Sequence, residues 1–108
     1  MQLRDSVIRQ RAATVPDGYG NQRPDWSSTD DAAYPADVQP LATDEQVVDE
    51  QRTTTRWRLI LPATADVIAS DRIAWDGDVY EIDGDVQRWK RRGVVHHLEA
   101  VLLTVNQG

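Results

Sequence analysis

The sequence predicts an all-β fold: a small antiparallel β-barrel of SH3-like or OB-like type, with five or six strands and one long acidic loop. In residues 71–105, β-branched and aromatic runs alternate with Asp-Gly and Gly turns at a spacing too tight for helices. Residues 45–61 end in the alternation of a half-buried strand. With 108 residues, the chain is expected to form a single domain, residues 1–108. Closing the sheet would remove its exposed edges.

The first part of the chain predicts one strand, a turn and a long loop. Residues 3–14 alternate loosely, which indicates a short strand, and residues 15–21 contain one Pro and two Gly in a turn cluster. Residues 23–44 are rich in Pro, Asp, Ser and Thr without a sustained apolar period, so we expect a loop projecting from the barrel. Two interpretations stay open: a mobile solvated loop, or a segment that becomes ordered inside an oligomer.

The second half supplies most of the predicted core. The strand over 45–61 ends at Pro62, and residues 63–70 form a short connection of at most one helical turn. The meander then turns at Asp76-Gly77, at Asp83-Gly84 and at a basic corner ending at Gly93. Both faces of the final strand, residues 94–105, become apolar, which places it centrally in the sheet. The predicted core consists of Trp57, Leu59, Leu61, Ile73, Trp75, Ile82, Leu98, Ala100 and Leu102.

Charge is distributed unevenly along the chain. The net charge is −6, and residues 25–50 contain eight acidic residues without any Lys or Arg. Such a stretch repels nucleic acid locally. The chain has no Cys, so we expect neither disulfides nor a thiolate nucleophile, and assembly in a reducing cytoplasm. No run approaches the about 20 apolar residues of a membrane span, and no signal peptide precedes the first strand, so we expect no membrane contact.

The titratable residues do not form a pattern typical of catalysis or metal binding. His96 and His97 are adjacent, so a strand would point them to opposite faces, where they could not chelate one metal. The Asp-Gly-Asp sequences lack the spacing of a calcium loop and fit turns. No nucleophile or phosphate-binding motif is present. We therefore predict no enzyme activity, no cofactor and no metal.

One basic cluster stands out, formed by Arg88, Trp89, Lys90, Arg91 and Arg92. Aromatic residues beside cations can hold single-stranded nucleic acid on a small barrel. The same cluster can bind a protein partner or the acidic surface of a neighbouring identical subunit. The net charge of −6 favours the protein interface.

Several segments together resemble a known family. They are residues 56–63 (RWRLILPA), 71–77 (DRIAWDG), 80–84 (YEIDG) with Trp89, and 96–100 (HHLEA), together with the earlier 17–21 (DGYGN) and Asp25-Trp26. They resemble the head-to-tail stopper, also called the head-closure or head-completion protein, of long-tailed siphophages, in the form seen in phages of actinobacterial hosts. The resemblance covers nearly the whole chain, and its motifs are structural.

The resemblance implies a structural virion protein of the neck. Six barrels would form a ring between the adaptor below the portal and the tail terminator, and loops would close the channel after packaging. Packaged double-stranded DNA would pass the acidic lumen without specific binding. The stiff or apolar positions of the acidic loop, with one acid between them, are the expected channel residues: Tyr34, Pro35, Asp37, Val38, Pro40 and Leu41. The alternative is a monomeric barrel that binds nucleic acid or a peptide through Trp89 and the basic cluster.

Overall fold

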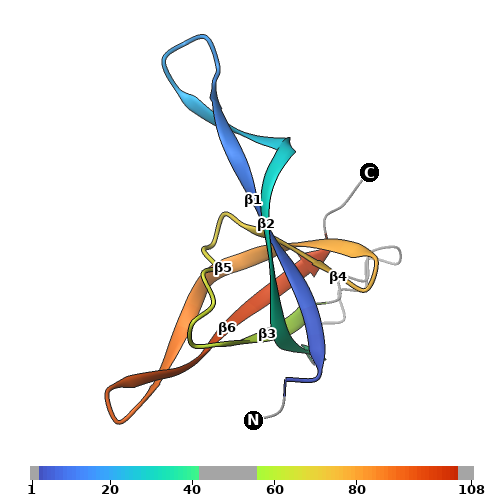
Figure 1. Ribbon diagram of the computed structural model, residues 1–108, viewed down its shortest axis with the longest axis vertical. Coiled ribbons are helices and arrows are strands. Elements are labelled where there is room, and N and C mark those ends of the chain that lie inside the picture. The colour runs from blue at the N-terminus through green and yellow to red at the C-terminus, as the bar shows by residue number, and fades with distance from the viewer. Residues whose placement is uncertain (1–2, 42–55, 105–108) are drawn as a thin grey trace, which may run out of the picture.

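The computed structural model describes residues 3–41 and 56–104, which form a closed antiparallel barrel of six strands (Figure 1). The order around the barrel is β1-β2-β3-β6-β5-β4. This confirms the predicted all-β barrel, and the described residues contain no helix. The strands are β1 (Asp5–Pro16), β2 (Gln22–Pro40), β3 (Arg56–Pro62), β4 (Arg72–Trp75), β5 (Asp78–Arg91) and β6 (Val94–Thr104).

Strand β2 overturns the predicted acidic loop. Its 19 residues pair with β1 from Gln22 to Ala36, and its end, Asp37 to Pro40, pairs with β3. The expectation of a loop over 23–44 is therefore wrong from Arg23 to Pro40, whereas Leu41 follows the strand and residues 42–44 lie outside the described residues. The reason is that small side chains suffice for the inner face. Ala36 and Val38 are buried, while the acidic residues between them and the turn remain in contact with water.

The predicted turn at Asp83-Gly84 is also wrong, because β5 continues through it. Gly84 has a φ of +80° and lies in a β-bulge, across which the pairing with β6 jumps from Asp83 to Gln87. The other two predicted turns are confirmed. Asp76-Gly77 joins β4 to β5, and Arg92-Gly93 joins β5 to β6, each with two positive φ angles as in type I′ hairpins.

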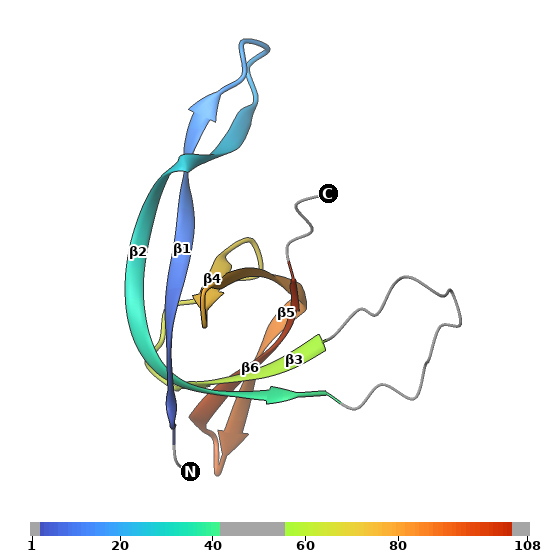
Figure 2. The ribbon, with the colours of Figure 1, turned by 90° about the vertical axis from the view of Figure 1, so that its right-hand side faces the viewer.

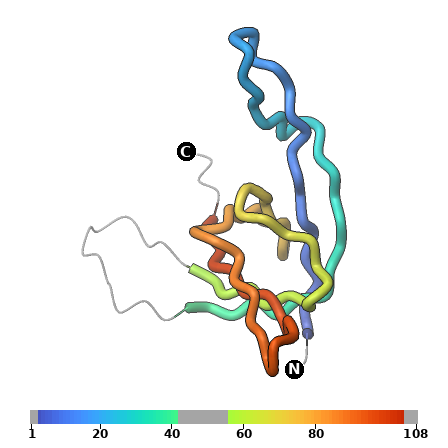
Figure 3. The backbone as a smooth tube through the Cα atoms, turned by 90° about the vertical axis from the view of Figure 1, so that its left-hand side faces the viewer, coloured from blue at the N-terminus to red at the C-terminus, as the bar shows by residue number. Residues whose placement is uncertain are grey.

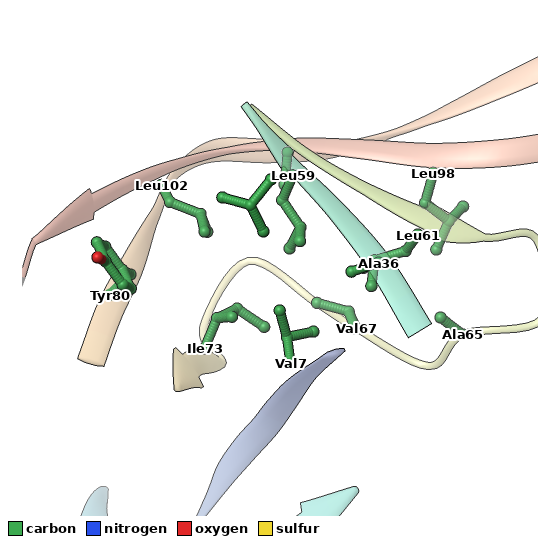
Figure 4. Packing of buried hydrophobic residues seen from close by; sticks show 12 residues of the cluster. Val7, Ala36, Leu59, Leu61, Ala65, Val67, Ile73, Tyr80, Leu98 and Leu102 are labelled. Carbon is green, nitrogen blue, oxygen red and sulfur yellow. The ribbon is translucent and has the colours of Figure 1, made fainter. Parts of the chain in front are cut away.

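The barrel interior confirms most of the predicted core. Leu59, Leu61, Ile73, Leu98, Ala100 and Leu102 are buried, while Trp57, Trp75 and Ile82 are half-buried and pack against them. Six further hydrophobic residues are buried in the described ranges and were not identified from the sequence, which are Val7, Ala36, Val38, Ala65, Val67 and Tyr80. Two of these, Ala65 and Val67, come from the connection between β3 and β4, which forms turns instead of the helical turn allowed for it (Figure 4).

Two hairpins extend beyond the barrel at opposite ends of its long axis (Figures 1 and 3). The β1–β2 hairpin bends at a bulge between Ala12 and Ala13 and continues to a turn around Tyr19, which is 90% exposed (Figure 2). The β5–β6 hairpin ends at Arg92-Gly93. The turn predicted over 15–21 is confirmed for residues 17–21, whereas Val15 and Pro16 belong to β1. The Asp17 carboxylate accepts hydrogen bonds from the backbone N–H groups of Tyr19 and Asn21.

Candidate functional site

Arg9 links the base of the β1–β2 hairpin to the barrel through hydrogen bonds. Its side chain on β1 is only 5% exposed, although a guanidinium must keep its charge. Nη2 donates to Asp30 Oδ2 on β2 at 3.0 Å, and Nη1 donates to the backbone oxygen of Asp66 at 3.2 Å. Arg9 thereby ties two neighbouring strands to the β3–β4 connection.

Arg11 makes the second half of the same cluster. Its Nε and Nη2 donate to the two carboxylate oxygens of Asp71, each at 2.9 Å, and its Nη1 donates to Asp66 at 3.1 Å. The Asp71 side chain is 1% exposed and also accepts the Ile68 N–H at 2.8 Å. These hydrogen bonds raise the pKa of Arg11 above its ordinary value, the bond to Asp71 contributing most, and the bond from Arg11 lowers the pKa of Asp66.

We call Arg9, Arg11, Asp30, Asp66 and Asp71 the arginine clamp. Breaking a buried ion pair leaves an uncompensated charge, so such a cluster constrains the position of the elements that it joins. The Arg9 Nε atom is the exception, being buried without a hydrogen-bond partner among the described residues. Sequence reasoning missed the clamp because residues that bond to one another in it, such as Arg11 and Asp71, are 60 positions apart in the sequence.

The predicted basic cluster lies at the β5–β6 hairpin, and we call Arg88, Trp89, Lys90, Arg91 and Arg92 the basic tip. Unlike the arginines of the clamp, Lys90, Arg91 and Arg92 form no ion pair with any residue that the structure describes. The structure thus brings the predicted interface residues together on one hairpin, where Lys90, Arg91 and Arg92 have no ion-pair partner among the described residues.

Trp89 is held in place while it remains accessible. Its ring stacks on that of His97 with an interplanar angle of 4° and 6.0 Å between centroids, yet Trp89 is 49% exposed. His97 Nε2 lies 2.7 Å from Glu99 Oε2, which fixes the imidazole. The expectation that His96 and His97 diverge is wrong, since their Nδ1 atoms lie 2.9 Å apart. The order of this aromatic group reduces the entropy lost on binding.

A groove of about 340 Å³ runs beside Trp89, where the bulge moves β5 away from β6. It is lined by Leu41, Arg58, Asp83, Trp89, Glu99 and Val101, among others. Leu41 was a predicted channel residue and Trp89 a predicted interface residue, so the groove joins one member of each predicted set.

The remaining predicted channel residues lie along β2 and do not form a loop tip. Val38 is buried in the core, and the Tyr34 hydroxyl accepts the Asp66 N–H at 3.2 Å. Pro35 and Pro40 are exposed, and Asp37 is half-buried, accepting a hydrogen bond from the Gln39 side chain. The channel residues therefore divide between the two faces of a strand.

The outward face of β1 and β2 forms a surface that sequence reasoning missed. Ile8 is 42% exposed, and Ala33 and Pro35 are exposed beside it on β2. Asp31 and Asp37 lie on the same face of β2, because they are two residues before Ala33 and two residues after Pro35. Neither takes part in a salt bridge among the described residues. We call these five residues the acidic wall. The alternation of inward and outward positions from Asp31 to Asp37 is the sequence signal that could have indicated this strand face, but the Pro and Asp content of the segment concealed it.

Two further kinds of feature are absent from the described ranges. No group of three or more His, Asp or Glu side chains there could hold a metal ion. No helix in those ranges is long and apolar enough to cross a membrane.

Comparison with known proteins finds a matching family and a similar solved structure. Residues 1–102 match the family described as phage head completion protein, a range that includes both hairpins. No curated protein matches the sequence. Among solved structures, the chain is similar to the phage-like element PBSX protein xkdH from Bacillus subtilis. That alignment has 17% identity and a TM-score of 0.41, and it covers 93% of this chain and 90% of the other.

Proposed function

The chain belongs to the phage head completion protein family, and we propose that it is the connector that joins the phage head to the tail. The family consists of structural virion proteins, which interact with other head and tail proteins. In the proposed arrangement, copies of the chain form a ring, with six subunits as the expected number. The ring lies in the neck between the adaptor below the portal and the tail terminator. The family match over residues 1–102 carries this proposal.

The surface charges support a role in protein assembly. A barrel that satisfies its own backbone hydrogen bonds needs no partner to complete its sheet. The basic tip nevertheless presents a half-exposed Trp89 and three cations that form no ion pair with the described part of the chain. Arg and Trp are the residues that most often dominate binding energy at protein interfaces. We propose that this tip contacts a protein of the neck.

The same proposal includes closure of the DNA channel after packaging. Only some of the channel residues predicted from the sequence are proposed to face the lumen. Tyr34 and Val38 hold β2 to the barrel, so they position the strand. Pro40 and Leu41, at the end of β2, are the predicted channel residues that we propose to face the lumen. Because the chain carries a net charge of −6, a lumen formed by its copies would repel DNA phosphates, so packaged DNA would pass without specific binding.

A second candidate function follows from Trp89. A half-exposed indole among four cations is also how small barrels stack single-stranded nucleic acid, and a peptide could use the same surface. Under this alternative the purified monomer binds DNA or RNA tightly and loses the affinity as salt rises.

Electron microscopy of particles produced without this protein tests the connector function. We expect DNA-filled heads that leak their DNA and carry no joined tails, and recovery of complete particles when the wild-type chain is supplied in trans. Complete tailed particles in its absence would contradict the proposal. Measuring binding of a labelled single-stranded oligonucleotide to the purified protein, at low and high salt, tests the alternative.

A further inference from the structure

We propose that the basic tip of one copy docks on the acidic wall of the next copy, so that a single kind of contact builds the assembly. The occupant of both surfaces is thus a second copy of this chain. This inference rests on the proposed ring and specifies which residues would form its subunit interface.

The tip has the composition of an interface centre. Residues 87–95 contain four cations and no acid, and Lys90, Arg91 and Arg92 form no ion pair with the described residues. Trp89 lies among them in an orientation fixed by His97. An aromatic anchor surrounded by cations is complementary to an apolar surface flanked by carboxylates.

The acidic wall has that complementary arrangement. Ile8, Ala33 and Pro35 supply exposed apolar surface, and Asp31 and Asp37 supply carboxylates at either side along β2. Asp31 accepts a hydrogen bond from Thr29 Oγ1 at 2.7 Å, and Asp37 accepts one from Gln39 Nε2. Among the residues that the structure describes, both carboxylates therefore bind only neutral groups of their own strand. Neither carboxylate belongs to the arginine clamp, so both can pair with a partner without breaking a structural contact.

The order of the strands around the barrel places the basic tip and the acidic wall on different pairs of strands. The β1–β2 pair and the β6–β5 pair are separated by β3 on one side and by β4 on the other. A contact between the tip of one copy and the wall of another is therefore heterologous, because two different surfaces meet. Heterologous contacts form a ring when the rotation between neighbours closes. The charge asymmetry of the chain thus serves a head-to-tail association.

Charge reversal on both sides provides the test. We define a tip variant, Arg91→Glu with Arg92→Glu, and a wall variant, Asp31→Lys with Asp37→Lys. Each is supplied to phage lacking the wild-type protein, and joined particles are counted. We expect loss of joined particles with either variant alone, because every interface then brings like charges together. The exposed Asp78→Lys is the matched control and should leave particle yield unchanged.

Restoring the opposite charges distinguishes this contact from docking of the tip on a different molecule. A chain carrying both reversals should recover joined particles, because the opposite charges again face each other. An equal mixture of the tip and wall variants should also recover them, because alternating copies pair at every interface. If neither the combined chain nor the mixture recovers, while circular dichroism shows folded variants, the tip meets another protein or nucleic acid and the inference is overturned.

Cysteine cross-linking gives an independent measurement, because the natural chain contains no Cys. A chain with Arg91→Cys and Asp31→Cys should form a ladder of covalent oligomers when assembled particles are oxidised, whereas either single variant should remain monomeric. A dimer from Arg91→Cys alone would show that two tips meet, which would overturn the inference. Normal particles without any copy of the protein would instead refute the proposed function. Defective particles without it, together with no ladder, would refute only this interface.

Discussion

The two hairpins of this barrel have the same secondary structure but differ in whether their cations form ion pairs within the described part of the chain. At the base of β1–β2, Arg9 and Arg11 are held by carboxylates from another strand and from the β3–β4 connection. At the tip of β5–β6, three cations form no ion pair with the described residues. The number of cations therefore does not identify an interaction surface. What matters is whether the fold already supplies their partners.

The energetic consequences of removing these charges should differ accordingly. Exposed charges without partners contribute little to folding stability, whereas a buried carboxylate or guanidinium becomes costly when its partner is removed. We therefore expect changes at the arginine clamp to alter stability, and changes at the basic tip to alter assembly.

The largest effect is expected where both hairpins join the common core. Trp75 packs edge-on against Trp57 with 5.1 Å between centroids, and 5.9 Å from Tyr80. Trp75→Ala should destabilise the barrel by about 3 kcal/mol, comparable with the total stability of many small domains. Thermal denaturation followed by circular dichroism measures this change. Trp89→Ala is the matched control at the tip and should shift the midpoint far less. A near-normal midpoint for Trp75→Ala would overturn its role in the core.

The second effect concerns the clamp itself. Asp71→Ala removes the partner of Arg11 and leaves the Ile68 N–H without its acceptor. Because Asp71 is buried, we expect a loss of about 3 kcal/mol in urea denaturation. The exposed Asp78→Ala should remain within about 0.5 kcal/mol of the wild type. Equal stability of the two variants would show that the clamp does not hold the hairpin.

The sequence predicted the barrel class because alternation and turn residues record local geometry. Leu59 and Leu61 occupy alternate positions of one strand, and Leu98 lies between His97 and Glu99 in another. Asp76-Gly77 adopts positive φ at a turn, so both signals are visible within a few residues. The buried Val67 carries no comparable signal. It belongs to an irregular connection whose burial depends on β1 lying across it (Figure 4).

The site was only partly predictable for the same reason. The basic tip is contiguous in sequence, so its residues could be identified together. The acidic wall combines Ile8 of β1 with Asp31 of β2, and this proximity follows from the register of the hairpin. The loop predicted over 23–44 failed because strand formation depends on the pairing with β1 and β3, which overrides the low strand propensity of Pro and Asp.

A smaller effect is expected at the bulge that leads into the basic tip. Gly84 has a φ of +80°, and a Cβ added there would meet nothing within 4 Å. Gly84→Ala should therefore cost about 1 kcal/mol through backbone strain alone. Gly84→Asn should cost less, because Asn tolerates the left-handed region better. Chemical denaturation of both variants measures the difference. If Ala were tolerated better than Asn, the strain at this bulge would not be that of a left-handed residue.

The smallest effect is a dependence on pH that should appear at the clamp and be absent at the tip. The hydrogen bond from Arg11 lowers the pKa of Asp66, so the folded state binds this proton less readily than the unfolded state does. The resulting stability is present above the unfolded pKa of about 4 and is lost as pH falls through the lowered pKa. The stability difference between the wild type and Asp66→Asn should therefore shrink on acidification. Arg91→Gln should show a constant difference over the same range, because Arg91 has no carboxylate partner among the described residues. Denaturation midpoints measured from neutral to acidic pH test both expectations. A pH-independent difference for Asp66→Asn would exclude Asp66 from the clamp.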